Sequence, residues 1–184
     1  TASQGIHVAN GDKFTVYTQE TTGSLIVSGT TYDAAIGGNG KHGVSGGSLD
    51  TSVGTVIING GNITATGGQY CAGIGGGWNS SDGNITVNGG NITASGGESG
   101  AGIGASQNST GTLNINISGG IINATGGIAA SAIGSGYGSD NTAVSINISG
   151  GIITARGNHV SAADIGNGVH SNTPTSISIT GGTI

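Results

Sequence analysis

The chain has 184 residues, of which 42 are glycine and only one each is proline and cysteine. Hydrophobic residues make up 33% of the chain and charged residues 6%, so large side chains are too scarce for the broad core of an ordinary globular domain. The formal net charge of −5, with three basic residues, argues against nucleic acid as a partner, because binding a polyanion depends on clustered Lys and Arg. No run of about 18 apolar residues occurs, so we expect no membrane insertion.

The first part of the chain, residues 1–54, predicts an irregular first coil of a repeating structure. It contains three short segments in which apolar and polar residues alternate, the pattern of a strand with one buried face. Their apolar residues are Phe14 with Val16, Leu25 with Val27, and Ile36. The longer segments 18–24 and 37–54 interrupt this pattern, and we interpret them as insertions at the corners of the coil.

From residue 55 onward the chain repeats itself. Gly-Gly pairs begin at Gly60, Gly89, Gly119, Gly150 and Gly181, so the repeats are 29 to 31 residues long, a period typical of solenoids. Each repeat contains three alternating segments. In the first repeat their apolar residues are Val56 with Ile58, Ile63 with Ala65, and Ala72 with Ile74.

Three strands in every repeat predict an all-β parallel solenoid with three sheets and about five coils. Strands of neighbouring coils then stack about 4.8 Å apart, and equivalent side chains form columns. The strongest test of this register is that Ile63, Ile92, Ile122 and Ile153 lie in one line. We expect a single domain over 1–184, with regular repeats from 55 to 184 that end in the middle of a coil. The natural chain is therefore expected to continue beyond this end, or another element to cover it.

The repeated sequences GGNITATGG and AGIGGG resemble the glycine-rich parallel β-helix repeats of secreted and cell-surface bacterial proteins. The resemblance rests on residues 60–68 with 72–77 and on 89–97 with 101–104, with weaker copies beginning at Gly119 and Gly150. It covers nearly the whole chain and implies a right-handed parallel β-helix. It also implies an extracellular setting, often adhesive or associated with carbohydrate, although a fold motif defines architecture better than activity.

A candidate ligand-binding site lies at the corner that follows the third strand. Trp78 and Tyr137 occupy equivalent positions there, two coils apart, with Gln107 in the coil between them. The two rings could stack on sugar rings while Gln107, Asn79 and Asn108 hydrogen-bond to hydroxyls. The alternative is that each ring folds back over the edge of the helix and covers apolar surface.

The acidic residues indicate a protein without catalytic or metal sites. Parallel β-helices are also the scaffold of enzymes that degrade polysaccharides, which is a further alternative, but such chemistry needs convergent carboxylates. The six aspartates are spread over several coils, and Arg156 is the only arginine. Asp82 and Asp140 lie at comparable corners, but two coils put them roughly 10 Å apart, too far to share a calcium ion, although binding at either one alone stays open. We predict no enzyme, metal or cofactor.

Two further surfaces were considered. The outward column Thr64, Thr93, Asn123 and Thr154 suggests an ice-binding face, but threonine is also a common exposed strand residue. The third strands present glycines, such as Gly73 and Gly102, that could leave a bare face open to a neighbouring backbone.

Together these features favour a non-catalytic module for adhesion or carbohydrate binding, secreted or displayed on a bacterial cell surface. Its expected partner is a glycan, such as a polysaccharide of a host or of a cell wall, and we expect it to belong to a longer multidomain chain. The main alternative is a structural spacer or stalk that holds another domain away from the cell.

Overall fold

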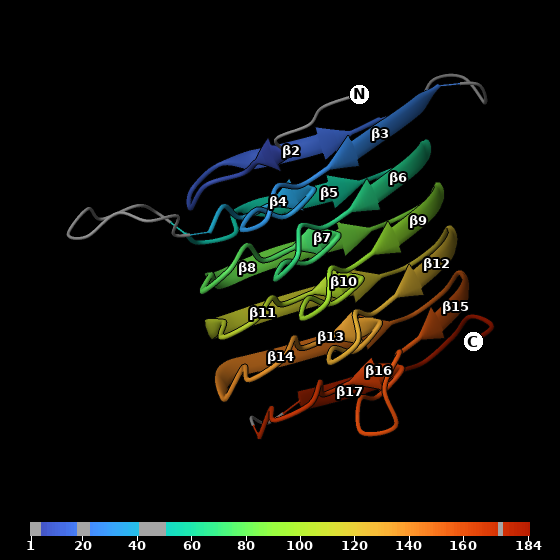
Figure 1. Ribbon diagram of the computed structural model, residues 1–184. Coiled ribbons are helices and arrows are strands. Elements are labelled where there is room, and N and C mark those ends of the chain that lie inside the picture. The colour runs from blue at the N-terminus through green and yellow to red at the C-terminus, as the bar shows by residue number, and fades with distance from the viewer. Residues whose placement is uncertain (1–4, 18–22, 41–50, 173–174) are drawn as a thin grey trace.

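The computed structural model describes residues 5–17, 23–40, 51–172 and 175–184. In these residues the chain winds through 17 short strands into a stack of coils (Figure 1). All the strand pairs are parallel, and they form three sheets along the stack. The described residues form no helix long and apolar enough to span a membrane.

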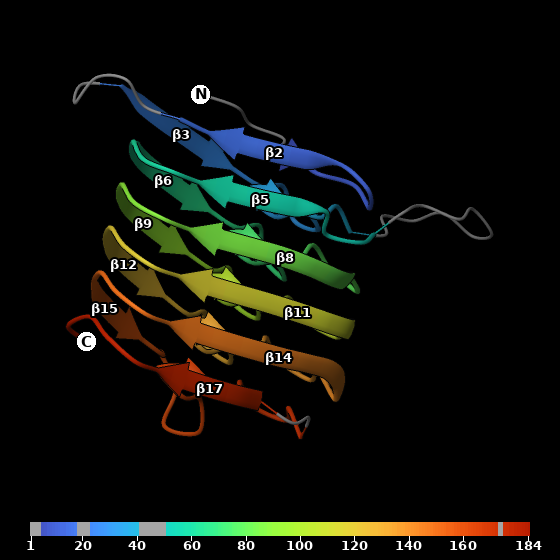
Figure 2. The ribbon, with the colours of Figure 1, turned by 180° about the vertical axis from the view of Figure 1, so that it is seen from behind.

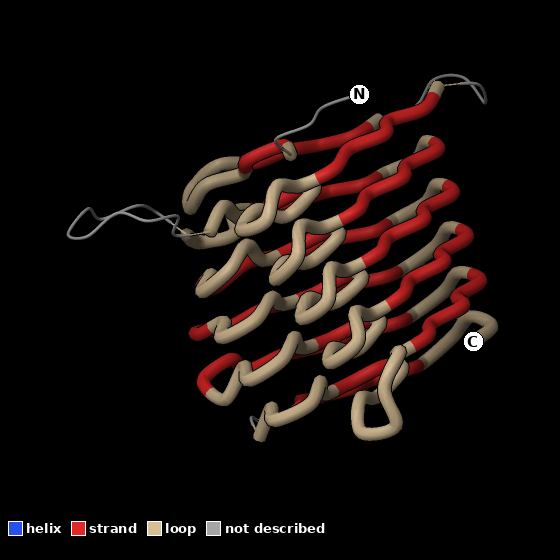
Figure 3. Tube along the Cα trace, in the orientation of Figure 1, coloured by secondary structure: helices blue, strands red, loops and turns tan. Residues whose placement is uncertain are grey.

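We number the sheets 1 to 3. Sheets 1 and 2 contain the longer strands and face each other across the interior (Figures 2 and 3). Sheet 1 consists of β2 (Lys13–Val16), β5 (Thr55–Ile58), β8 (Ser81–Val87), β11 (Thr110–Ile117), β14 (Asn141–Ile148) and β17 (Thr175–Ile179). Sheet 2 consists of β3 (Ser24–Ser28), β6 (Asn62–Thr66), β9 (Asn91–Ser95), β12 (Ile121–Thr125) and β15 (Ile152–Arg156).

Sheet 3 closes the third side with strands of two residues each. Its members are β1 (Ile6–His7), β4 (Ile36–Gly37), β7 (Ile74–Gly75), β10 (Ile103–Gly104), β13 (Ile133–Gly134) and β16 (Ile165–Gly166). The predicted fold is therefore confirmed: the chain is a right-handed parallel β-helix of about five coils with three strands per coil.

The predicted register is also confirmed. Ile63 pairs with Ile92, Ile92 with Ile122, and Ile122 with Ile153, so the four residues form one column. All four are buried. The corresponding isoleucines in the middle coils of the other two sheets are also buried: Ile85, Ile115 and Ile146 in sheet 1, and Ile74, Ile103 and Ile133 in sheet 3. The core is thus a narrow stack of packed aliphatic side chains in which each layer contacts the next.

The first coil follows the expected pattern and contains one strand that the sequence did not indicate. Phe14, Leu25 and Ile36 lie on β2, β3 and β4, as the alternation indicated. The structure adds β1, where Ile6 pairs with Ile36 and extends sheet 3 by one layer. Much of the two expected corner insertions, residues 18–22 and 41–50, lies outside the described part of the chain.

The glycines of sheet 3 do not form an exposed bare face, which corrects one expectation. Gly73 and Gly102 are buried, because the backbone of the chain's own neighbouring coils and strands approaches them. Gly75 shows why the position requires glycine: its φ is +135°, and an added Cβ would lie 1.9 Å from the carbonyl oxygen of Gly104. The close approach that glycine allows takes place inside the molecule.

The outer faces of sheets 1 and 2 differ in chemistry. On sheet 2 the register places Thr64, Thr93, Asn123 and Thr154 in one exposed column, so the threonine row is interrupted by one asparagine. Sheet 1 carries amide ladders that run along the stack. They join Asn88 Nδ2 to Asn59 Oδ1 (2.8 Å), Asn114 Nδ2 to Asn84 Oδ1 (3.1 Å), and Asn147 Nδ2 to Asn116 Oδ1 (3.2 Å).

Candidate functional site

Two sets of turns lie side by side along one edge of the stack. The backbone N–H of Trp78 donates to the carbonyl of Tyr32 (3.0 Å), and the N–H of Gln107 donates to the carbonyl of Tyr70 (2.9 Å). The N–H of Tyr137 makes the equivalent bond to Ser99 (3.0 Å). We call this surface the corner edge. One column of its turns lies between sheets 2 and 3 and consists of residues 31–32, 69–70, 98–99 and 128–129. The other column follows sheet 3 and consists of residues 78–79, 107–108, 137–138 and 169–170.

The column of candidate residues predicted from the sequence therefore exists. Trp78, Gln107 and Tyr137 lie in successive coils and make equivalent backbone hydrogen bonds. All three side chains are half-buried. The sequence did not show that this column runs beside a second column of turns.

That second column gives Trp78 two aromatic neighbours. Its ring lies 5.2 Å from the ring of Tyr32 and 6.4 Å from that of Tyr70, with tilts of 49° and 45°. Tyr32 and Tyr70 also contact each other at 5.7 Å. We call these three half-buried rings the aromatic cluster. The tyrosines were missed, although both precede the third-strand isoleucine of their coil by four residues and so share one column.

Tyr137 belongs to a separate ring contact. It meets the ring of His170 edge to face, with centroids 5.4 Å apart and an interplanar angle of 86°. The coil of Gln107 lies between this contact and the aromatic cluster. The corner edge thus presents rings at two places along the stack rather than one continuous platform.

The two asparagines of the predicted site have a structural role in their turns. Asn79 and Asn108 have φ values of +57° and +53°, which asparagine tolerates better than most residues. Their backbone N–H groups donate to the next coil, to Gln107 (3.1 Å) and to Tyr137 (3.0 Å). The side chain of Asn108 is exposed and that of Asn79 half-buried, so both amides lie at the surface of the corner edge.

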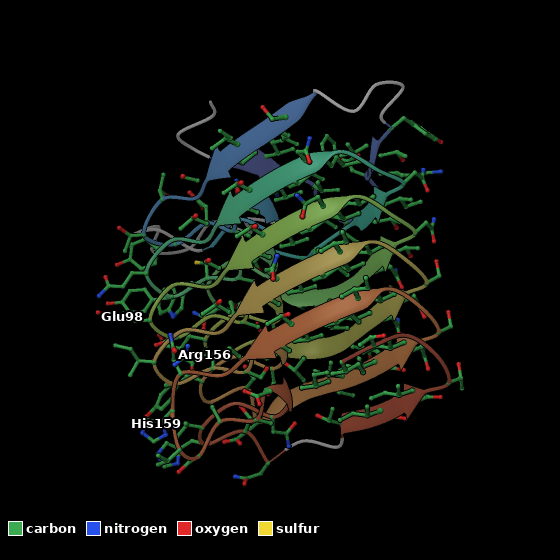
Figure 4. The ribbon with its side chains drawn as sticks, turned by 90° about the vertical axis from the view of Figure 1, so that its right-hand side faces the viewer. Glu98, Arg156 and His159 are labelled. Carbon is green, nitrogen blue, oxygen red and sulfur yellow. The ribbon has the colours of Figure 1, made fainter. Side chains whose placement is uncertain are left out.

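Charged side chains are rare in this chain, and several lie on this same side of the molecule. Figure 4 shows Glu98, Arg156 and His159 along one edge of the stack. The Nε2 of Gln69 donates to Glu98 Oε2 at 3.0 Å, beside the aromatic cluster. Gln69 and Glu98 were not among the predicted site residues, because only the stacking of the coils brings them together.

Three of the described aspartates serve as side-chain hydrogen-bond acceptors at corners of the coils. Asp164 Oδ1 accepts from the N–H of Gly157 (2.7 Å), and Asp140 Oδ1 accepts from the N–H (2.9 Å) and Nδ2 (3.2 Å) of Asn172. Asp33 accepts from the Thr30 hydroxyl and, at 3.2 Å, from a backbone N–H. Such roles explain why single carboxylates occur at isolated corners.

No group of three or more His, Cys, Asp or Glu in the described residues is placed to hold a metal ion. The side chain of Asp82, one of the two aspartates considered for calcium, lies outside the described part of the structure. Cys71 is fully buried, and its Sγ contacts the carbonyl oxygen of Thr31 at 3.6 Å. Burial raises the pKa of its thiol to about 12, so it is not a nucleophile at neutral pH.

The coils and the corner edge define the class of this protein: a parallel β-helix with a cluster of aromatic rings on one edge. The family model for the beta helix repeat matches residues 56–78, 85–107, 115–137 and 146–170, just over half of the chain. The chain therefore belongs to the beta helix repeat family. Each match begins at a sheet 1 strand and ends on the corner edge. No curated protein and no solved structure matches the chain.

Proposed function

We propose that the protein is a non-catalytic module for adhesion or carbohydrate binding, and that it binds a glycan at the corner edge. The observation that carries this proposal is the aromatic cluster of Tyr32, Tyr70 and Trp78, three residues in mutual ring contact that are half-buried and so still reach solvent. The apolar face of a sugar ring packs well against an aromatic ring, and an exposed cluster of rings offers such a surface.

Polar groups beside the cluster support a glycan as the ligand. Gln69, Glu98 and Gln107 present amide and carboxylate groups within one or two coils of Trp78, where they can hydrogen-bond to hydroxyls. The chain has three basic residues and a net charge of −5. An acidic polysaccharide would meet little positive charge here, so the proposed ligand is a neutral glycan.

The proposed setting is a bacterial cell surface or secretion, with this β-helix as one part of a longer multidomain chain. This part of the proposal rests on the sequence resemblance to glycine-rich repeats of secreted bacterial proteins. The proposed absence of catalysis is supported by Asp33, Asp140 and Asp164, whose carboxylates accept hydrogen bonds at separate corners instead of converging on one groove.

A glycan array tests the proposal through Trp78→Ala. This change removes the largest ring of the cluster, and we expect the affinity for the bound glycan to fall about tenfold or more, because aromatic anchors dominate such sites. Tyr17→Ala is the matched control, because Tyr17 is 73% exposed but directly follows β2, outside the corner edge. Equal binding by the wild-type protein and Trp78→Ala contradicts the proposed site.

A structural spacer remains the second candidate. It is favoured by the register of sheet 2, which continues from β3 to β15 without a shift and so forms a stiff rod. A chain that binds no glycan on the array but keeps two fused flanking domains at a fixed distance, measured by energy transfer, would support the spacer over the binding module.

A further inference from the structure

Thr142 carries a buried hydroxyl that the described protein groups leave unpaired. The residue is 1% exposed, and its Oγ1 has no hydrogen-bond partner among the described residues. A buried hydroxyl without a partner destabilises the folded state, because it gives up its hydrogen bonds to water without replacing them. Folded proteins seldom accept this cost, because ordered water commonly satisfies such groups.

An irregularity of sheet 1 creates space beside this hydroxyl. The pairing of β8 with β11 shifts between Thr110 and Leu113, where β11 contains one extra residue, as in a β-bulge. The extra segment includes Gly111, which pairs with Thr142. Thr110 and Leu113, on either side of the shift, line a small cavity that also has Thr142, Ser80 and Ser109 in its wall.

The cavity matches one water molecule in size and in chemistry. It offers about 10 Å³ to the centre of a water molecule, which is enough for one water and too little for a larger ligand. The side chains of Ser80 and Ser109 are 2% and 3% exposed, and their hydroxyls lie 3.3 Å apart. The Ser109 hydroxyl is already fully engaged, because it also bonds to the N–H, the hydroxyl and the carbonyl of Ser106. The Ser80 hydroxyl bonds only to Ser109 among the described side chains and can take part in a further hydrogen bond, so a water in the cavity would have Thr142 and Ser80 as its two polar partners.

We infer that this cavity is a binding site for one structural water, which bridges Thr142 Oγ1 to the hydroxyl of Ser80. Ser80 follows Asn79 in the chain, and Ser109 follows Asn108, so the water lies directly behind the turns of the corner edge. It joins the coils of Ser80 and Thr142 where the bulge interrupts the regular pairing. This inference does not depend on the proposed function.

High-resolution crystal structures of the wild type, Thr142→Ser and Thr142→Val test the site. We expect one water peak within hydrogen-bond distance of Oγ1 in the wild type, its retention in Thr142→Ser, and its loss in Thr142→Val, which has the same shape without the hydroxyl. A wild-type cavity without electron density for a water overturns the inference. This comparison with Thr142→Ser stands even if Thr142→Val fails to fold.

Oxygen-17 relaxation dispersion supplies the matching measurement in solution, because it counts waters that exchange slowly. The expected result is one fewer long-lived water in Thr142→Val than in the wild type and in Thr142→Ser. An equal number of long-lived waters in all three proteins contradicts the proposed water site.

Discussion

At the scale of single residues, sheet 3 depends on glycines that no other residue can replace. Gly75 combines a φ of +135° with a contact of 1.9 Å between a hypothetical Cβ and the Gly104 oxygen. We therefore expect Gly75→Ala to lower the free energy of unfolding by more than about 2 kcal/mol, or to prevent folding. Denaturant unfolding measures the change. Gly23→Ala is the control, because a Cβ at Gly23 meets no atom within 4 Å; an equal loss in both variants would contradict this account.

The buried thiol of Cys71 predicts a dependence of stability on pH. Burial raises its pKa from about 9 to about 12, so the unfolded chain releases the thiol proton first. Ionisation of this thiol therefore does not change the free energy of unfolding below about pH 9. As the pH rises from about 9 toward 12, the thiol ionises in the unfolded chain but not in the folded protein, so the free energy of unfolding falls.

Denaturant unfolding of the wild type and of Cys71→Ala across this pH range isolates the contribution of the thiol, because the two proteins differ only at this residue. The wild type should lose more stability than Cys71→Ala between pH 9 and 12. Parallel curves for the two proteins would show that the thiol is not protected by burial.

Some residues of the candidate site could be predicted from the sequence, and others could not. The column of Trp78, Gln107 and Tyr137 follows from counting within each repeat, and the structure places it as expected. Tyr32 and Tyr70 also share a column, but their contact with Trp78 depends on how two turns on either side of sheet 3 pack together. The repeat period predicts which residues of different coils lie in one column along the stack. It does not predict which turns of the same coil lie next to each other, and only the structure shows this.

At the scale of the strand, alternation decides which side chains stabilise the fold. Ile121 and Ile122 are neighbours on β12, but the first is 50% exposed and the second is fully buried. Ile122→Ala should cost about 2–5 kcal/mol through lost burial and a cavity in the column. Ile121→Ala should cost less than about 1 kcal/mol. Chemical denaturation of both variants checks this difference, and similar costs would mean that the interior columns do not carry the stability.

The strands themselves were predictable to different degrees. Sheets 1 and 2 follow from alternating isoleucines, such as Ile63 and Ala65, that mark one buried face. The strands of sheet 3 contain only two residues because glycines such as Gly75 turn the chain sharply. The strand β1 and the bulge near Gly111 each involve one or two residues, too few to produce a period. These local features depend on contacts with the neighbouring coil.

At the scale of the whole molecule, each described coil contacts only the coils next to it. Central strands such as β9 and β12 are paired on both sides, whereas β17 is paired only with β14. Stability in such arrays is a sum of local and nearest-neighbour contributions. Hydrogen exchange should therefore be slowest for amides of β9 and β12 and fastest for those of β17. Uniform protection from end to end would instead indicate one cooperative unit.

The amide ladders of sheet 1 give the rod a chemical direction. In all three described asparagine pairs the later coil donates and the earlier coil accepts: Asn88 to Asn59, Asn114 to Asn84, and Asn147 to Asn116. Their dipoles therefore add along the axis instead of cancelling. A linear molecule laid against this face would meet a surface with a head and a tail, so its two orientations would differ in energy. A row of solvated side chains without aligned hydrogen bonds would not distinguish the two orientations of the bound molecule.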